Sequence, residues 1–207
     1  MPITNTIRNS DAMDEKKIDD IFQNDFNEAL DVLKKFIGNP ENFLNLRNAG
    51  EIMVKAIKSG NKIISCGNGG SMSDASHFAE ELSGRFRGNR PALPAISITD
   101  AAHITCTAND YGFESIFSRF IEGLGLKGDV LLAISTSGNS ANILKAAQVA
   151  KLKGMKVVAL TGKDGGELAK IADVEIRAPK SSFSDRVQEI HIKAIHSLIN
   201  YIENNIS

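Results

Sequence analysis

Short apolar segments that alternate with helical stretches dominate the sequence from about residue 62 onward. Each segment ends in a small polar loop, and most are followed by a helical pattern; the segments are 62–66, 95–99, 129–134, 156–160 and 174–177. Continuous apolar strands that alternate with helices are typical of a parallel sheet covered by helices on both faces. The pattern therefore predicts a three-layer, doubly wound α/β fold with five parallel strands.

Two further helices are predicted ahead of the first strand. Apolar residues between positions 18 and 37 recur at steps of three and four, which predicts a helix with one buried stripe that ends at Gly38-Asn39-Pro40. A second helix follows and ends near Gly60. A length of 207 residues fits one domain, and no linker or repeat divides the sequence. We therefore expect a flexible arm at residues 1–15 and a single domain at residues 16–207.

Charge and hydropathy exclude several classes of partner. Lys and Arg total 24 against 25 for Asp and Glu, a balance that argues against nucleic-acid binding. No apolar run approaches the roughly 18 residues of a membrane span, and the polar N-terminus has no signal-peptide core. The two cysteines, Cys66 and Cys106, form no C-x-x-C motif, which favours a reduced chain. We expect a cytoplasmic protein with no membrane or nucleic-acid partner.

The loop after the first predicted strand is rich in glycine and reads SCGNGGS at residues 65–71. Ligands of open α/β sheets bind beside the carboxyl ends of the strands, and glycines let backbone N–H groups approach them closely. The loop departs from the dinucleotide fingerprint, because Met72 stands where its last glycine is required, and it lacks the Gly-Lys-Ser/Thr of a nucleotide P-loop. A ligand-binding loop and a plain strand-to-helix turn both fit these residues.

A second loop, STSGNS at residues 135–140, offers four hydroxyl groups between a buried strand and a helix start. Free N–H groups and the helix dipole favour an anion at such a place, and hydroxyls add further donors. One Ser or Thr commonly caps a helix N-terminus, but capping accounts for one hydroxyl rather than four. Phosphate binding is the favoured interpretation, with capping alone as the alternative.

Polar side chains on two predicted helices form a second candidate site. His77 and Glu81 are four residues apart and share a helix face, which suits two metal ligands or a general base with a helper, whereas a solvated pair is the alternative. Gln188 and His196 lie near one face of the last helix among apolar residues. A lone histidine in such surroundings is more often a core residue than a catalyst, and we expect His191 to be one.

Longer segments shared with a known family occur at six places: CGNGGS, HFAEELSGRF, ANDYGF, GDVLLAISTSGNSANI, ALTGKDGG and DRVQEIHIKAIH. Together they resemble the phosphoheptose isomerases, which are enzymes built on a sugar-isomerase (SIS) domain. The similarity runs from about residue 20 to residue 203. STSGNS marks the wider SIS superfamily, whereas HFAEELSGRF and RVQEIHIKAIH are much more specific to this family.

The resemblance implies an aldose–ketose isomerase that converts sedoheptulose 7-phosphate to D-glycero-D-manno-heptose 7-phosphate through an enediol. This reaction is the first step toward the ADP-heptose precursor of the lipopolysaccharide core. The family further implies a flavodoxin-like strand order, a homotetramer with active sites between subunits, and one Zn²⁺ per subunit. Residues 16–207 would then form a single SIS domain.

The resemblance also implies roles at matching positions. Glu81 would be the general base and His196 the general acid. Zinc would be held by His77, Glu81, Gln188 and His196, in a catalytic or a structural role that the sequence leaves open. The phosphate would be held by Ser135, Thr136, Ser137 and Ser140. The sugar would be bound by Asn68, Gly69, Gly70, Ser71, Glu81, Arg85, Asn109, Asp110, Asp185 and Gln188.

Three other functions fit parts of the same pattern. A non-catalytic SIS protein that binds the bacterial replication initiator would share the fold and the serine loop but needs neither acid nor base, so Glu81 and His196 favour the enzyme. A sugar-phosphate-sensing transcriptional regulator would need a DNA-binding domain, for which we expect no room. Arabinose 5-phosphate isomerase performs the same reaction class on a shorter sugar, but its family members often carry nucleotide-sensing modules that this sequence lacks.

Overall fold

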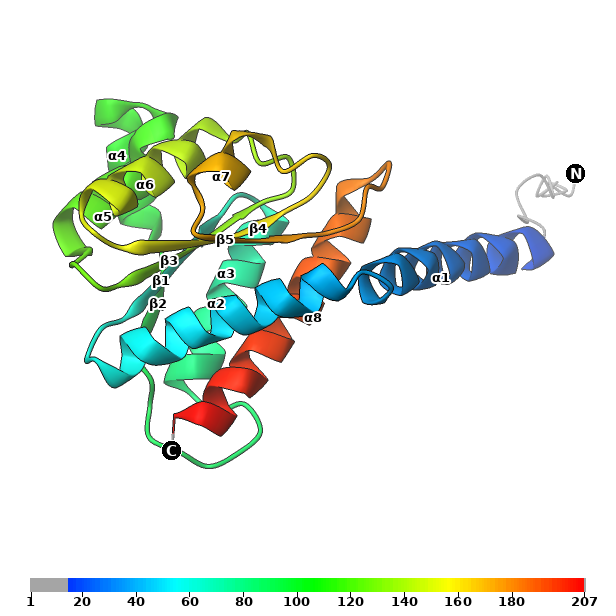
Figure 1. Ribbon diagram of the computed structural model, residues 1–207. Coiled ribbons are helices and arrows are strands. Elements are labelled where there is room, and N and C mark those ends of the chain that lie inside the picture. The colour runs from blue at the N-terminus through cyan, green and yellow to red at the C-terminus, as the bar shows by residue number, and fades with distance from the viewer. Residues whose placement is uncertain (1–14, 207) are drawn as a thin grey trace, which may run out of the picture.

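Five parallel strands form the centre of the computed structural model, which describes residues 15–206 (Figure 1). They are β1 (Ile63–Gly67), β2 (Ala95–Ser97), β3 (Val130–Ser135), β4 (Lys156–Thr161) and β5 (Val174–Arg177). Their order across the sheet is β2-β1-β3-β4-β5, and every neighbouring pair is parallel. The predicted five-stranded, doubly wound sheet with flavodoxin-like order is therefore confirmed.

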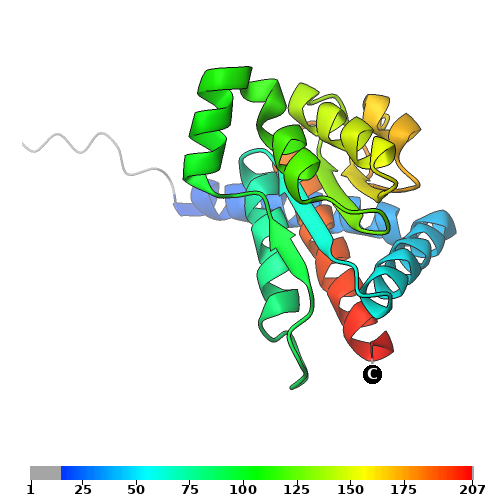
Figure 2. The same ribbon diagram turned by 90° about the vertical axis from the view of Figure 1, so that its left-hand side faces the viewer.

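Helices cover both faces of this sheet. They are α1 (Glu15–Ile37), α2 (Pro40–Lys58), α3 (Gly70–Ser83), α4 (Ala101–Tyr111), α5 (Ile116–Leu124), α6 (Ala141–Leu152), α7 (Gly166–Ile171) and α8 (Ser184–Asn205). In Figures 1 and 2, α2, α3 and α8 lie on one face, and α5, α6 and α7 lie on the other. The two helices predicted before the first strand are α1 and α2. The sequence pattern did not separate α4 and α5, which together connect β2 to β3.

The side chains of β3 divide the core into two clusters. Leu132 and Ile134 pack with α2, α3 and α8, whereas Leu131 and Ala133 pack with α5 and α6. Alternate residues of a strand point to opposite faces, and every residue of β3 is buried. Burial on both faces explains why the strand is a continuous apolar run rather than an alternating one.

The apolar stripe of α1 is buried only in the second half of the helix. Val32 and Phe36 are buried, whereas Phe22 is 59% and Phe26 is 78% exposed. Figure 1 shows that the first half of α1 extends beyond the rest of the domain. The prediction of one buried stripe is therefore wrong for this half within a single chain, because the start of α8 reaches it only at its end, where Arg186 lies 3.5 Å from Asp25, and leaves Phe22 and Phe26 exposed.

Two other predictions concern the ends of the chain and membrane spans. The flexible arm predicted at residues 1–15 lies outside the described residues apart from Glu15, which begins α1. Within residues 15–206, no helix combines the length and the apolar character that crossing a bilayer requires. The predicted domain limits, 16–207, stay a prediction.

Replacing Leu132 with Ala should test the two-sided burial of the sheet. Leu132 is fully buried, so we expect Leu132→Ala to lower the free energy of unfolding by about 2–5 kcal/mol, through lost transfer free energy and a cavity. The matched control is Leu152→Ala on α6, where the side chain is 88% exposed, and its effect should stay within about 0.5 kcal/mol. Urea denaturation measures both, and equal losses would contradict the assignment of Leu132 to the core.

Candidate active site

A cavity of about 340 Å³ lies beside the carboxyl ends of β1 and β3. From β1 the chain adds β2 on one side and β3 on the other, so this edge is the switch point in strand order where open α/β sheets bind ligands. The cavity is lined by Asn68, Gly69, Gly70, Ser71, Ile134, Ser135, Thr136, Ser140, Ser184 and Gln188. Both loops singled out in the sequence therefore contribute to one site.

The hydroxyl-rich loop joins β3 to α6. The hydroxyl oxygens of Ser135 and Ser140 lie 3.2 Å apart and share a hydrogen bond. Ser140 is the N-cap residue of α6, but its side chain makes no capping hydrogen bond. Thr136 also lines the cavity, whereas the Ser137 hydroxyl accepts a hydrogen bond from the backbone N–H of Asn139 at 3.2 Å. Capping therefore does not account for the Ser140 hydroxyl.

Close packing explains the glycines of the first loop. Gly69 has a φ of +55°, in the region that favours glycine. A Cβ added at Gly67 would overlap the backbone oxygen of Ser71, and one at Gly70 would lie 2.7 Å from the amide nitrogen of Gln188. The strand-to-helix turn by itself explains why glycine is required at positions 67 and 69. Gly70, in contrast, allows the Gln188 side chain on α8 to reach the start of α3 at the cavity.

Asn68 and Asn142 hold the two loops together. Their side-chain amides exchange two hydrogen bonds, of 2.9 Å and 2.8 Å. Asn142 stands in the first turn of α6 and is only 2% exposed, so the pair forms largely away from water. The sequence analysis did not single out Asn142, although it lies in the same GNSAN stretch as the hydroxyl loop.

The second candidate site lies where α3 packs against α8. Nε2 of His77 is 2.9 Å from Nε2 of His196 and 3.8 Å from Oε1 of Glu81. The ring of Phe86 stacks on His196 with 5.9 Å between ring centroids. Burial lowers the pKa of His196, and the neighbouring His77 lowers it further. The fold thus brings the predicted base, Glu81, and the predicted acid, His196, from different helices to the same side chain, that of His77.

These side chains also suit a divalent cation. His77, Glu80 and Glu81 each place a ligand atom within 4.8 Å of the others. Glu81 and Nε2 of His196 face Nε2 of His77, whereas Glu80 lies 2.8 Å from its Nδ1. Imidazole nitrogen and carboxylate oxygen are both zinc ligands, so the donor set fits Zn²⁺. Gln188, the remaining predicted ligand, lies two turns earlier on α8 and lines the cavity. Glu80 was missed, although its spacing from His77 places it on the same helix face.

Six predicted substrate-binding residues do not line the cavity within this chain, and two of them are Glu81 and Ser137. Asn109 and Asp110 are exposed at the end of α4 and share a hydrogen bond of 2.7 Å. Arg85 is exposed just after α3. Asp185 is exposed at the start of α8, with its carboxylate 3.3 Å from Arg186.

Burial shifts the pKa of two further ionisable residues, Asp74 and His191. Burial raises the pKa of Asp74 to about 6, and its Oδ2 is buried without a hydrogen-bond partner among the described residues. Sequence reasoning missed Asp74, although it stands one turn before His77. His191 is fully buried, and its Nε2 lies 2.8 Å from the carbonyl oxygen of Thr161, which confirms its predicted place in the core.

Comparison with known proteins agrees with this arrangement. The sequence model of the SIS domain family matches residues 26–162, so the chain contains a SIS domain. A phosphoheptose isomerase of Serratia proteamaculans is 56% identical over 187 residues, which are 90% of this chain and 97% of the relative. A phosphoheptose isomerase of Histophilus somni is 59% identical over 176 residues, covering 85% of this chain and 90% of the relative.

Solved structures lead to the same family. The phosphoheptose isomerase of Neisseria gonorrhoeae matches with a TM-score of 0.83 and 37% identity, covering 90% of this chain and 99% of that one. The enzyme of Francisella tularensis matches with a TM-score of 0.84 and 37% identity, covering 89% and 97%. This chain belongs to the phosphoheptose isomerase family.

Replacing Ser140 with Ala should separate its two interpretations. Its hydroxyl makes no capping bond but shares a hydrogen bond with Ser135, so Ser140→Ala should lower the free energy of unfolding by no more than about 0.5–1.5 kcal/mol. It should weaken binding of a phosphorylated sugar by about 1.5–3 kcal/mol, as expected for a lost hydrogen bond to a charged group. Urea denaturation and titration calorimetry give the two values.

The matched control for capping is Asp100→Ala. The Asp100 carboxylate accepts a hydrogen bond of 2.7 Å from the N–H of His103 and caps α4, so its loss should cost about 1 kcal/mol of stability. A stability loss for Ser140→Ala equal to that of the control, with unchanged binding, would favour capping instead.

Proposed function

We propose that this protein converts sedoheptulose 7-phosphate to D-glycero-D-manno-heptose 7-phosphate through an enediol, as the first step toward ADP-heptose. The observation that carries the proposal is the contact among His77, Glu81 and His196 on helices that also border the hydroxyl-lined cavity, in a chain of this family. We place the reaction in the cytoplasm, where reducing conditions keep thiols such as the exposed Cys106 free.

Moving a proton between C1 and C2 requires a base at the carbon and a second group at the oxygens. The Glu81 carboxylate takes the proton from one carbon and returns it to the other. The lowered pKa of His196 favours the neutral imidazole, which can both donate and accept a proton as the enediol oxygens exchange theirs. The ring of Phe86, stacked on His196 with 5.9 Å between ring centroids, orients the imidazole that performs this exchange.

The loops hold the rest of the substrate. The phosphate binds to the hydroxyls of Ser135, Thr136, Ser137 and Ser140 beside the start of α6. The sugar lies along Asn68, Gly69, Gly70, Ser71 and Gln188, toward the acid–base pair. Phosphate contacts are remote from the reacting carbons, so their binding energy serves to orient C1 and C2 against Glu81.

Zn²⁺ is the proposed cofactor, one per subunit, held by His77, Glu81 and His196 with Glu80 or Gln188 beside them. The support is the donor set at the α3–α8 contact. When bound there, zinc would polarise the substrate carbonyl.

A homotetramer with sites between subunits accounts for two features of the single chain. Arg85, Asn109, Asp110 and Asp185 are exposed rather than gathered at the cavity, so they are available to a site shared with a second copy. The first half of α1 exposes Ile21, Phe22, Phe26 and Leu30, an apolar stripe that a copy of the same helix would cover. We assign this stripe to the contact between subunits.

Replacing Glu81 with Gln tests the proposed base. The amide cannot accept the carbon-bound proton, so turnover of sedoheptulose 7-phosphate should fall about 10²–10⁴-fold, or about 3–5 kcal/mol, while the fold is kept. Solvent deuterium should enter the sugar carbon with the wild type but not with the variant. The control is Glu51→Gln on the exposed face of α2, which should match the wild type. Near-normal exchange in Glu81→Gln would remove this residue from the role of base.

Removing His77 tests the proposed metal site without an activity assay. At a free Zn²⁺ concentration of about 100 times Kd, the ion should stabilise the wild type by about 2.7 kcal/mol, seen as a rise in Tm. His77→Gln should lose this stabilisation. His103→Gln should keep it, because His103 bonds the Ile116 carbonyl outside the site. Equal zinc-dependent shifts in both variants would contradict the assigned ligands.

A further inference from the structure

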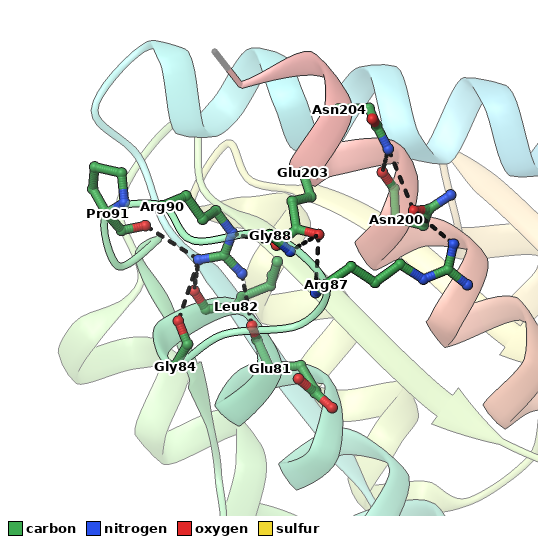
Figure 3. Close-up of polar contacts among 10 residues, drawn as sticks. All are labelled: Glu81, Leu82, Gly84, Arg87, Gly88, Arg90, Pro91, Asn200, Glu203 and Asn204. Carbon is green, nitrogen blue, oxygen red and sulfur yellow. Dashed lines mark hydrogen bonds and ion pairs between the residues drawn. The ribbon is translucent and has the colours of Figure 1, made fainter.

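Arg90 forms a dense set of hydrogen bonds in the loop between α3 and β2 (Figure 3). One terminal nitrogen of its guanidinium donates to the carbonyl oxygen of Glu81 at 2.7 Å, and the other donates to that of Leu82 at 2.8 Å. The second nitrogen also lies 3.5 Å from the carbonyl oxygen of Gly84. The guanidinium is therefore bonded to backbone groups at the end of α3, one of which belongs to the proposed base.

The position of these bonds matters because Glu81 stands near the C-terminus of its helix. α3 ends at Ser83, and carbonyl groups in the last turn of a helix have no partner within the helix. The last turn of α3 contains no basic residue of its own. Arg90 supplies a donor to the carbonyl of Glu81 and, beside the backbone N–H of Leu93, a second donor to that of Leu82. It also brings the positive charge that favours a helix C-terminus. The turn that carries the Glu81 carboxylate is thus held from outside the helix.

Glu203 connects this arrangement to α8. Its Oε1 accepts a hydrogen bond of 3.1 Å from Nε of Arg90, and its Oε2 accepts from the backbone N–H groups of Arg87 and Gly88 at 3.2 Å and 3.3 Å. The side chains of Arg90 and Glu203 are only 9% and 10% exposed. Figure 3 shows the carboxylate reaching from α8 to the loop after α3. The pair joins the C-terminal ends of the helices that carry Glu81 and His196.

We propose that Arg90, held by Glu203, is a positioning residue for the isomerisation. It fixes the last turn of α3 against α8 and so sets the place of the Glu81 carboxylate relative to His196. This inference rests on the proposed function, because it takes Glu81 as the base. Arg90 acts through the backbone of α3, while the phosphate is held at the other end of the site by the loop after β3.

The first test is the steady-state kinetics of Arg90→Lys with sedoheptulose 7-phosphate. Lysine keeps the charge but lacks the planar fork that bonds several acceptors at once. A displacement of about 1 Å at a reacting group can cost about 100-fold in rate, so kcat per folded molecule should fall about 10–100-fold while KM stays within about threefold. Glu203→Gln should lower kcat in the same direction, and the double variant should be no worse than Arg90→Lys, because the two act as one unit.

The matched control is Lys62→Gln, which removes another partly buried ion pair, with Asp129, at the amino ends of the strands. Its kcat per folded molecule and KM should equal those of the wild type. A fall in Arg90→Lys no larger than the loss of folded protein would overturn the proposal, as would kcat effects that multiply in the double variant. A tenfold rise in KM with unchanged kcat would instead make Arg90 a binding residue.

Amide hydrogen exchange tests the same inference without substrate. In Arg90→Lys, exchange should accelerate at least tenfold in the peptide that covers residues 79–85 and stay unchanged in β3. Unchanged exchange in residues 79–85 would overturn the positioning role. If the wild type fails to convert the sugar, the proposed function is wrong. The exchange rates of residues 79–85 still test, independently of activity, whether Arg90 holds the last turn of α3.

Discussion

The packing of α3 against α8 is the contact on which the rest of the site depends. Near its start, Gly70 leaves space for the amide of Gln188. In the middle, the two histidines meet at 2.9 Å. At its end, Arg90 and Glu203 connect the helices through a largely buried ion pair. Because the helices meet at three levels, polar groups far apart in the sequence lie along one line that begins at the cavity.

The sheet could be predicted because each buried strand is marked by a run of apolar residues within its own short segment. Strands covered on both faces are predominantly apolar, and residues 130–134 of β3 and 157–160 of β4 form uninterrupted apolar runs. The switch-point rule then directed attention to the loops that do line the cavity. The apolar stripe of α1 led to a wrong prediction of burial. Its periodicity shows that one helix face is to be covered, but not whether the covering residues belong to the same chain.

The candidate site was predictable only in part. The spacing of His77 and Glu81 places them on one helix face, but their meeting with His196 depends on how α8 packs, and spacing alone favoured a core role for a histidine among isoleucines. Only the resemblance to a known family connected the two helices in advance. Asn142 and Arg90 were missed, because their importance lies in bonds to Asn68 and Glu203, which are distant in sequence and which no local pattern reveals.

The reciprocal amide pair of Asn68 and Asn142 has a consequence for selectivity. Two hydrogen bonds run between the same two side chains, so neither loop can slide without breaking both bonds or carrying the other loop with it. The distance from the serine hydroxyls to the histidine pair is therefore set by the protein backbone and does not adjust to each ligand. Under the proposed function, a fixed separation would select substrates by length: a sugar bound through its terminal phosphate would react only if its carbon chain were long enough to bring the other end to the histidines.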